Sequence, residues 1–164
     1  ELLALKGRLG LIINGTADDY LDVKSKKEML EAMGYETRML YVMANNEVSS
    51  ARNKMRGLLG GREIPEEIRS AKYKKSLANI KDFETLFGPN NFDLYNNNLD
   101  LQIAPSKEKE EENKKLLGLF KKIRAWANKK PTKAIRQRWL SSGHLNEMYR
   151  LLGIETINET QKDL

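Results

Sequence analysis

The sequence predicts an α/β fold, with a parallel sheet of about three strands flanked by helices and a helical extension at the C-terminal end. Short apolar runs at 11–13, 37–44 and 92–95 are bounded by Gly, Asn and Thr, as is typical of buried strands. Elsewhere, apolar residues recur at helical spacing. We expect an α/β portion over residues 1–103 and a basic helical extension over 104–164 that packs on the same domain.

The run at 11–13 organises the N-terminal part of the chain, because it ends abruptly in Asn14 and Gly15. Gly15 permits a tight turn, and Thr16 or Asp18 can cap the helix that follows. Ligands of open α/β sheets bind at the carboxyl ends of strands, so these polar residues are the first candidates for a functional site. An ordinary strand-to-helix turn is the simpler interpretation of the spacing alone.

The next elements follow from the same patterns. A helix over 18–33 and a strand over 37–44 would form a right-handed βαβ unit with the first strand. A helix from 46 to about 55, a long helix that begins at 65 and a third strand over 92–95 complete the α/β portion. The buried face of the long helix is expected to contain Ile68, Ala71, Leu77, Ile80 and Phe83.

Residues 56–62 are rich in glycine and carry an arginine at each end, Arg56 and Arg62. Glycine indicates mobility, and arginines on a mobile loop are suited to binding phosphate. A solvated surface turn explains the composition equally well, so both interpretations remain open. The segment does not have the spacing or the Lys-Ser/Thr pair of a GxxxxGK[ST] phosphate loop.

The composition excludes several classes of site. The chain has no cysteine and one histidine, His144, which excludes disulfides, thiolate metal sites and a multi-histidine site. No apolar run is long enough for a membrane span and no signal peptide is evident, so we expect a cytoplasmic protein with no membrane partner. The chain begins at Glu1, in what reads as the middle of a helix, and we therefore expect a fragment of a longer protein.

The net charge of +6 is unevenly distributed, since residues 113–146 contain no acidic residue. This asymmetry indicates an acidic partner, most simply nucleic acid or phosphate. Trp126 and Trp139 could stack on bases, although their helical spacing favours the core. A mixed charge run over 106–115 is expected to be a solvated helix face. The candidate nucleic-acid contacts are Lys121, Lys122, Arg124, Lys129, Lys130 and Arg136.

A series of short motifs occurs in a fixed order along the chain. The motifs are GRLGLIINGT at 7–16, GYET at 34–37, ARN at 51–53, REIP at 62–65, NI at 79–80, LFGPNNF at 86–92, IRAW at 123–126 and Trp139. Together they resemble a group of phage-encoded P-loop kinases, often described as zeta-toxin-like. The resemblance extends to about Ser142 and is strongest between Gly7 and Asn96.

This resemblance implies a parallel P-loop sheet in which the strand at 11–13 flanks the strand that bears the phosphate loop. It also implies ATP and Mg²⁺ as cofactors, a nucleotide or phosphorylated substrate, and an arginine lid that stabilises the charge of phosphoryl transfer. The residues with an implied catalytic role are Asn14, Asp19, Arg52, Arg56 and Arg62. Those expected to bind the nucleotide are Arg52, Arg56, Arg62 and Thr16.

The chain departs from the family pattern in three ways. It contains no GxxxxGK[ST] loop, it has Asn14-Gly15-Thr16-Ala17 in place of Asp-Gly-Thr-Gly, and Tyr95 stands where an acidic residue is expected. An amide cannot act as a general base and binds Mg²⁺ less well than a carboxylate, although Asp18 or Asp19 could substitute. We therefore expect the C-terminal portion of an ATP-dependent phosphotransferase, phage-encoded, active in the infected host cytoplasm and catalytically incomplete as given. The alternative is a degenerate kinase fold that acts as a nucleic-acid- or protein-binding module.

Overall fold

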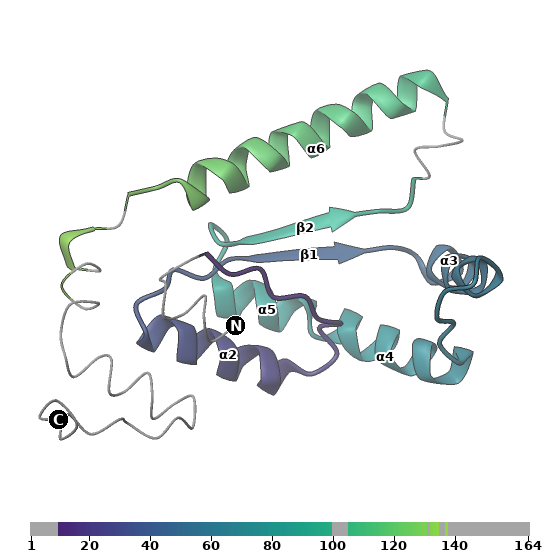
Figure 1. Cartoon of the computed structure of the whole chain (residues 1–164), viewed down its shortest axis with the longest axis horizontal. Helices are drawn as coiled ribbons and strands as arrows, with labels where there is room; N and C mark the ends of the chain where they lie inside the picture. Colours follow the sequence, from purple (N-terminus) through teal and green to yellow (C-terminus); the bar gives the residue numbers. More distant parts are fainter. Residues whose placement is uncertain (1–9, 100–104, 131, 135–136, 138–164) are drawn as a thin grey trace, which may run out of the picture.

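The computed structural model describes residues 10–99, 105–130, 132–134 and 137 (Figure 1). The described elements are α2 (Tyr20–Ala32), β1 (Met39–Met43), α3 (Asn46–Leu58), α4 (Glu66–Ala78), α5 (Ile80–Phe87), β2 (Phe92–Asn96) and α6 (Ser106–Ala127). β1 and β2 pair in parallel, with Met39 opposite Phe92 and Met43 opposite Asn96. The prediction of an α/β fold with a parallel sheet is confirmed.

The prediction of a strand at 11–13 is wrong, since residues 10–19 have no regular structure and Ile12 is 94% exposed. A strand is stable only when its N–H and C=O groups pair with a neighbour. In the part of the chain that the structure describes, β1 and β2 pair only with each other, so this run has no strand beside it. The βαβ unit expected from 11–13, α2 and β1 is therefore not formed.

The core lies where α2 and α5 cover one face of the sheet (Figure 1). Its centre is Phe83 of α5, which is fully buried. The ring of Phe83 lies 5.6 Å from that of Tyr20 and 6.5 Å from that of Tyr41. Met33, which follows α2, and Leu30 complete the buried apolar set. This small core fixes α2 and α5 against β1.

The long helix predicted from residue 65 is two helices, α4 and α5, separated at Asn79. The side-chain amide of Asn79 donates to the carbonyl oxygen of Ala17 at 3.1 Å, so this residue serves the preceding turn as well as the helix junction. Ile68 was expected to be buried, but it is half exposed, and its neighbour Arg69 is buried instead. Because Arg69 finds polar partners on α3, the buried face of α4 is polar at this end.

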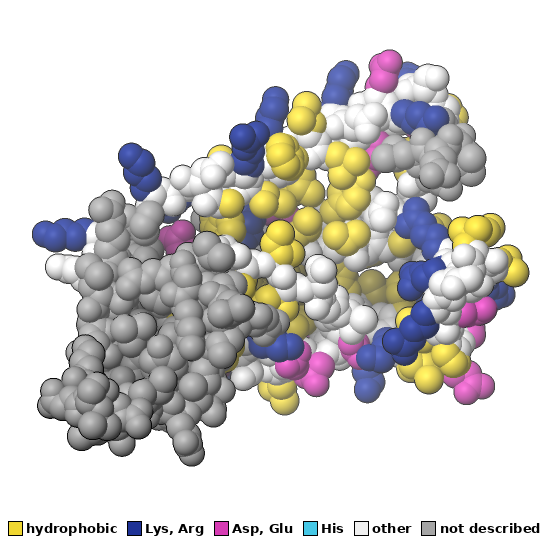
Figure 2. All heavy atoms as spheres, in the orientation of Figure 1, with side chains coloured by type: hydrophobic (Ala, Val, Ile, Leu, Met, Phe, Trp, Pro, Cys, Tyr) yellow, Lys and Arg dark blue, Asp and Glu magenta, His cyan; other side chains and the backbone are white. Residues whose placement is uncertain are grey.

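The opposite face of the sheet is only partly covered by α6, which lies beside β2 (Figure 1). Figure 2 shows hydrophobic side chains gathered between α6 and the strands, and Leu40, Val42 and Phe120 all remain more than a third exposed. The charge run at 106–115 is mostly solvated as expected, but Glu112 is buried against Tyr95. None of the described helices has the length and apolar character that a membrane span requires.

Candidate functional site

The carboxyl ends of β1 and β2 are joined by asparagines. The backbone N–H of Asn97 donates to the carbonyl of Met43 at 2.7 Å, and that of Asn45 donates to Oδ1 of Asn98 at 2.6 Å. α3 begins directly after Asn45 and passes beside this edge (Figure 1). The edge at which open α/β sheets bind ligands is therefore held by one main-chain bond and one bond to the side-chain amide of Asn98.

Arg52 of α3 lies over this edge. Its Nη1 donates to the carbonyl of Asn97 at 2.6 Å and its Nη2 to that of Leu99 at 3.4 Å. The guanidinium was predicted to bind phosphate, but two of its nitrogens already donate to the chain that follows β2. This geometry gives Arg52 a role in fixing the segment 97–99 against α3.

The glycine-rich segment after Arg52 forms an ordered helix end. Gly61 N–H donates to the carbonyl of Arg56 at 2.9 Å and Gly60 N–H to that of Gly57 at 3.0 Å, and Gly60 has a φ of +79°. This pair of bonds is a Schellman motif, which requires the left-handed conformation at Gly60. The glycines thus provide turn geometry. Arg56 and Arg62, at the two ends of this turn, are exposed.

A buried arginine connects α3 to α4. The Nε of Arg69 donates to Glu66 at 2.8 Å, Nη2 to Oδ1 of Asn46 at 2.8 Å and Nη1 to Oγ of Ser49 at 3.1 Å. The hydrogen bond from Arg69 lowers the pKa of Glu66 to about 2. The first turns of α3 and α4 are therefore joined through one guanidinium, which sequence reasoning missed. The signal available was an arginine among the apolar positions of α4.

Residues 14–19, which we call the Asn14 turn, are attached to the C-terminal half of α4. Ser76 Oγ donates to the carbonyl of Thr16 at 2.9 Å, and Lys72 Nζ lies 2.9 Å from Asp18 Oδ2. A hydrogen bond from the Thr16 hydroxyl lowers the pKa of Asp18, and the hydrogen bond from Lys72 makes a smaller contribution in the same direction. Asn14 itself is exposed.

Two other residues complete the turn. Ala17 has a φ of +55°, in the left-handed region that favours glycine. Asp19 caps α2 by accepting the N–H of Asp22 at 3.0 Å. The predicted lid consists of Arg52, Arg56 and Arg62. No interaction among the described residues joins Asn14, Thr16 or Asp19 to these three lid arginines. The turn and the lid are instead connected through α4.

A family model, that of the zeta toxin, matches residues 2–108, which is more than half of the chain. The chain belongs to the zeta toxin family. Comparisons with curated proteins and with solved structures give no match. The zeta toxin match includes the Asn14 turn, the lid and both strands, and it ends within the first turn of α6. The resemblance to P-loop kinases of this family is thus confirmed over that range.

The zeta toxin family implies Mg²⁺, an ion that binds one or two carboxylates together with substrate phosphates. The described residues contain no group of three or more His, Asp or Glu side chains placed to hold a metal. At the Asn14 turn, the carboxylate of Asp18 pairs with Lys72, that of Asp19 caps a helix, and Asn14 offers only a neutral amide. This turn therefore offers Mg²⁺ no free carboxylate. Arg56 and Arg62, at the ends of the glycine-rich turn, are exposed, and guanidinium groups are suited to binding phosphate.

The predicted nucleic-acid contacts on and after α6 divide into two sets. Lys122 pairs with Asp93 of β2, and Lys129 lies 3.9 Å from Glu36. The others that the structure describes are exposed, and Arg136 and Trp139 lie outside the described residues. Trp126 is half-buried with the guanidinium of Arg38 6.0 Å from its ring, which favours packing. The members that form no ion pair within the described residues are Lys121, Arg124 and Lys130.

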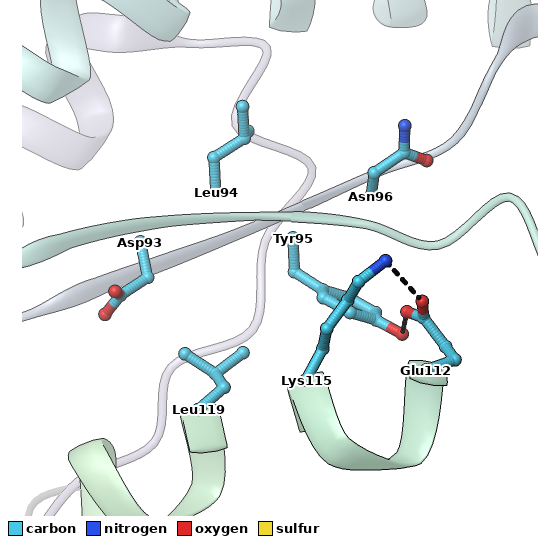
Figure 3. Close-up of a pocket in the computed structure, with 7 residues that line it drawn as sticks. All are labelled: Asp93, Leu94, Tyr95, Asn96, Glu112, Lys115 and Leu119. Atoms are coloured by element: carbon cyan, nitrogen blue, oxygen red, sulfur yellow. Dashed lines mark hydrogen bonds and ion pairs between the residues drawn. The ribbon is translucent and has the colours of Figure 1, made fainter. Parts of the chain in front are cut away.

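A groove of about 260 Å³ separates β2 from α6 (Figure 3). Tyr95 points from β2 toward Glu112 of α6 and donates its hydroxyl to that carboxylate, and Lys115 donates to the same carboxylate at 3.3 Å. Burial, together with Glu112, raises the pKa of Tyr95 to about 12. Because Tyr95, Glu112 and Lys115 pair with one another, we interpret the groove as a contact between β2 and α6.

Proposed function

We propose that this member of the zeta toxin family is the C-terminal portion of an ATP-dependent phosphotransferase, catalytically incomplete as given and active in the cytoplasm of a phage-infected host. The observation that carries the proposal is the pair of exposed arginines, Arg56 and Arg62, on an ordered turn at the end of α3, the helix that begins at the carboxyl edge of a parallel sheet. The transferred phosphoryl group carries charge over three oxygens, and positioned guanidinium groups stabilise that charge.

In this proposal the predicted site residues have different roles. Arg56 and Arg62 contact the phosphates of ATP, while Arg52 holds the segment after β2 in place. Asn14 and Thr16 contact the phosphoryl acceptor, a nucleotide or another phosphorylated molecule. Asp19 shapes the turn by capping α2. The chain's own residues orient the reactants, and no step is assigned to a magnesium ion, because the carboxylates of Asp18 and Asp19 already have partners in the fold.

Calorimetry with ATP and Mg²⁺ tests the proposal on this chain and on a version extended upstream in its native reading frame. We expect the extended protein to bind ATP and the double variant Arg56→Ala, Arg62→Ala to bind at least about tenfold more weakly, the loss expected for charge-assisted hydrogen bonds. Arg124→Ala, an exposed arginine on α6, is the matched control and should leave the affinity unchanged. Absence of ATP binding by both proteins would overturn the kinase proposal.

The second candidate function is a nucleic-acid-binding module, which is favoured by the exposed cations on and after α6 and by the absence of acidic residues over 113–146. In Figure 2 Lys and Arg side chains project from the outer side of α6, away from the sheet. If Lys121, Arg124 and Lys130 each contact one phosphate, log K for duplex DNA should fall against log salt with a slope of about −2.7. The triple charge reversal should abolish binding, whereas Lys54→Glu on α3 should not.

A further inference from the structure

Asn53 lies within α3 and is only 4% exposed. Its side-chain amide makes two hydrogen bonds to the backbone of one distant residue. Nδ2 donates to the carbonyl of Ile64 at 2.7 Å, and Oδ1 accepts the N–H of Ile64 at 3.0 Å. Asparagine is a poor helix former, so its place inside α3 calls for an interaction of this kind. The amide therefore ties α3 to Ile64, where the chain returns from the glycine-rich turn. We call this pair of hydrogen bonds the staple.

The staple closes residues 54–63 into a compact unit. Inside it, the Schellman bonds described above reverse the chain, and two glycines allow close contact. A Cβ at Gly57 would lie 2.5 Å from Oε2 of Glu63, and a Cβ at Gly61 would lie 2.9 Å from Cγ of Arg56. The side chain of Arg56 therefore packs over Gly61, the residue that precedes Arg62 in the chain. Arg56 and Arg62 both belong to this closed unit.

We propose that Asn53 is a positioning residue, which closes residues 54–63 and so holds Arg56 and Arg62 as a preformed pair for the phosphates of one ligand. The inference rests on the proposed function for the identity of the ligand. Its physical basis is preorganisation. Arg56 is fixed by the last turns of α3, and residues 59–63, which carry Arg62, would lose conformational freedom on binding if they were free, whereas the closed unit has lost it on folding. A pair of guanidinium groups fits a diphosphate or triphosphate better than a single carboxylate.

Limited trypsin digestion tests the staple without any ligand, because trypsin cleaves after arginine. Asn53→Leu keeps a side chain of similar volume and removes both bonds to Ile64, and Asn53→Ala is the second variant. We expect both to increase the rate of cleavage after Arg56 and Arg62 at least about tenfold, since the cleaved fraction follows local opening. Calorimetry with inorganic pyrophosphate on the same proteins should show Kd rising about tenfold in Asn53→Leu.

Phe83→Leu is the matched control, because it weakens the core of the molecule and does not touch the staple. Its cleavage after Arg56 and Arg62 should stay near the wild-type rate. If Phe83→Leu and Asn53→Leu increase this cleavage equally, or if Asn53→Leu changes neither cleavage nor Kd, the positioning role is overturned. If neither the wild-type chain nor the version extended upstream binds pyrophosphate, the assignment of a phosphate ligand fails with the proposed function, and the positioning role with it. An intact staple that resists trypsin would then remain as a structural finding alone.

Discussion

Arg38 and Asp93 form an ion pair across the two strands of the sheet, with side chains that are 6% and 11% exposed. Nε of Arg38 donates to Oδ2 of Asp93 at 2.9 Å, and Nη1 donates to the carbonyl of Asn90 at 2.9 Å. The second carboxylate oxygen of Asp93 contacts Lys122 of α6. A single carboxylate therefore joins the chain entering β1, the strand β2 and the helix α6.

Asp93→Ala should lower the free energy of unfolding by about 3 kcal/mol, because it leaves the Arg38 guanidinium buried without its counter-ion. Lys122→Ala removes the more exposed partner and should cost less than about 1 kcal/mol. Urea unfolding monitored by circular dichroism measures both values. Equal losses in the two variants would show that the buried pair contributes nothing beyond a surface ion pair.

The same carboxylate gives the stability a defined pH dependence. Burial alone would raise the pKa of Asp93, but the hydrogen bonds from Lys122 and Arg38 together hold it below the ordinary value of 3.8. Because the pKa is lower in the folded than in the unfolded chain, the stabilisation is complete above about pH 4 and is lost as the pH falls through the folded-state pKa.

Urea unfolding between pH 6 and pH 3 should therefore show stability falling at the acid end. Asp93→Asn cannot titrate, so its stability should decline less steeply over the same interval. Asp18, whose pKa is also lowered, leaves a residual slope in this variant. Identical slopes in the wild-type chain and in Asp93→Asn would contradict the assignment to Asp93.

Local patterns in the sequence predicted those elements whose stability depends on near neighbours. The extents of α2 and β2 followed from spacing and turn residues. The run at 11–13 shows where this reasoning fails. Its apolar character is that of a strand, but a strand forms only when another lies beside it, and its own residues do not determine that.

The roles of the site residues divide in the same way, into those that depend on neighbours in the sequence and those that depend on contacts with distant elements. The helix cap was predicted at Thr16 or Asp18, but the residue that caps α2 is Asp19, one position further along the chain. The partners of Asn53, Arg69 and Glu112 lie on other elements, so no spacing rule predicts them. Each is a polar residue inside a helix with no local reason to be there, and that is the signal by which Asn53 could have been singled out.

Ala17→Gly should stabilise the chain by about 1 kcal/mol. Ala17 has a φ of +55°, where a Cβ is strained, and glycine occupies this conformation without that cost. The family pattern carries glycine at this position. The turn is held in shape by bonds from Ser76 and Asn79 to the carbonyls of Thr16 and Ala17, which the substitution preserves.

The control for this prediction is Ala71→Gly at an exposed position of α4, which should destabilise the chain by about 1 kcal/mol. Thermal unfolding of the two variants should therefore shift in opposite directions. A decrease in stability for Ala17→Gly would mean that the alanine side chain contributes packing that outweighs the strain at φ.

The three lid arginines should separate into two classes when each is replaced by alanine. Arg52→Ala removes donors to the carbonyls of Asn97 and Leu99 and should destabilise the fold by about 2 kcal/mol, since it leaves those acceptors without their charged partner. Arg56→Ala and Arg62→Ala remove exposed side chains and should each change stability by less than about 0.5 kcal/mol. Chemical unfolding of the three single variants measures this difference. We expect this difference because the Arg52 guanidinium donates to main-chain carbonyls, whereas the guanidinium groups of Arg56 and Arg62 are exposed to solvent. If Arg56→Ala were as destabilising as Arg52→Ala, the exposed pair would be part of the fold, and the lid would have no free cations for phosphate.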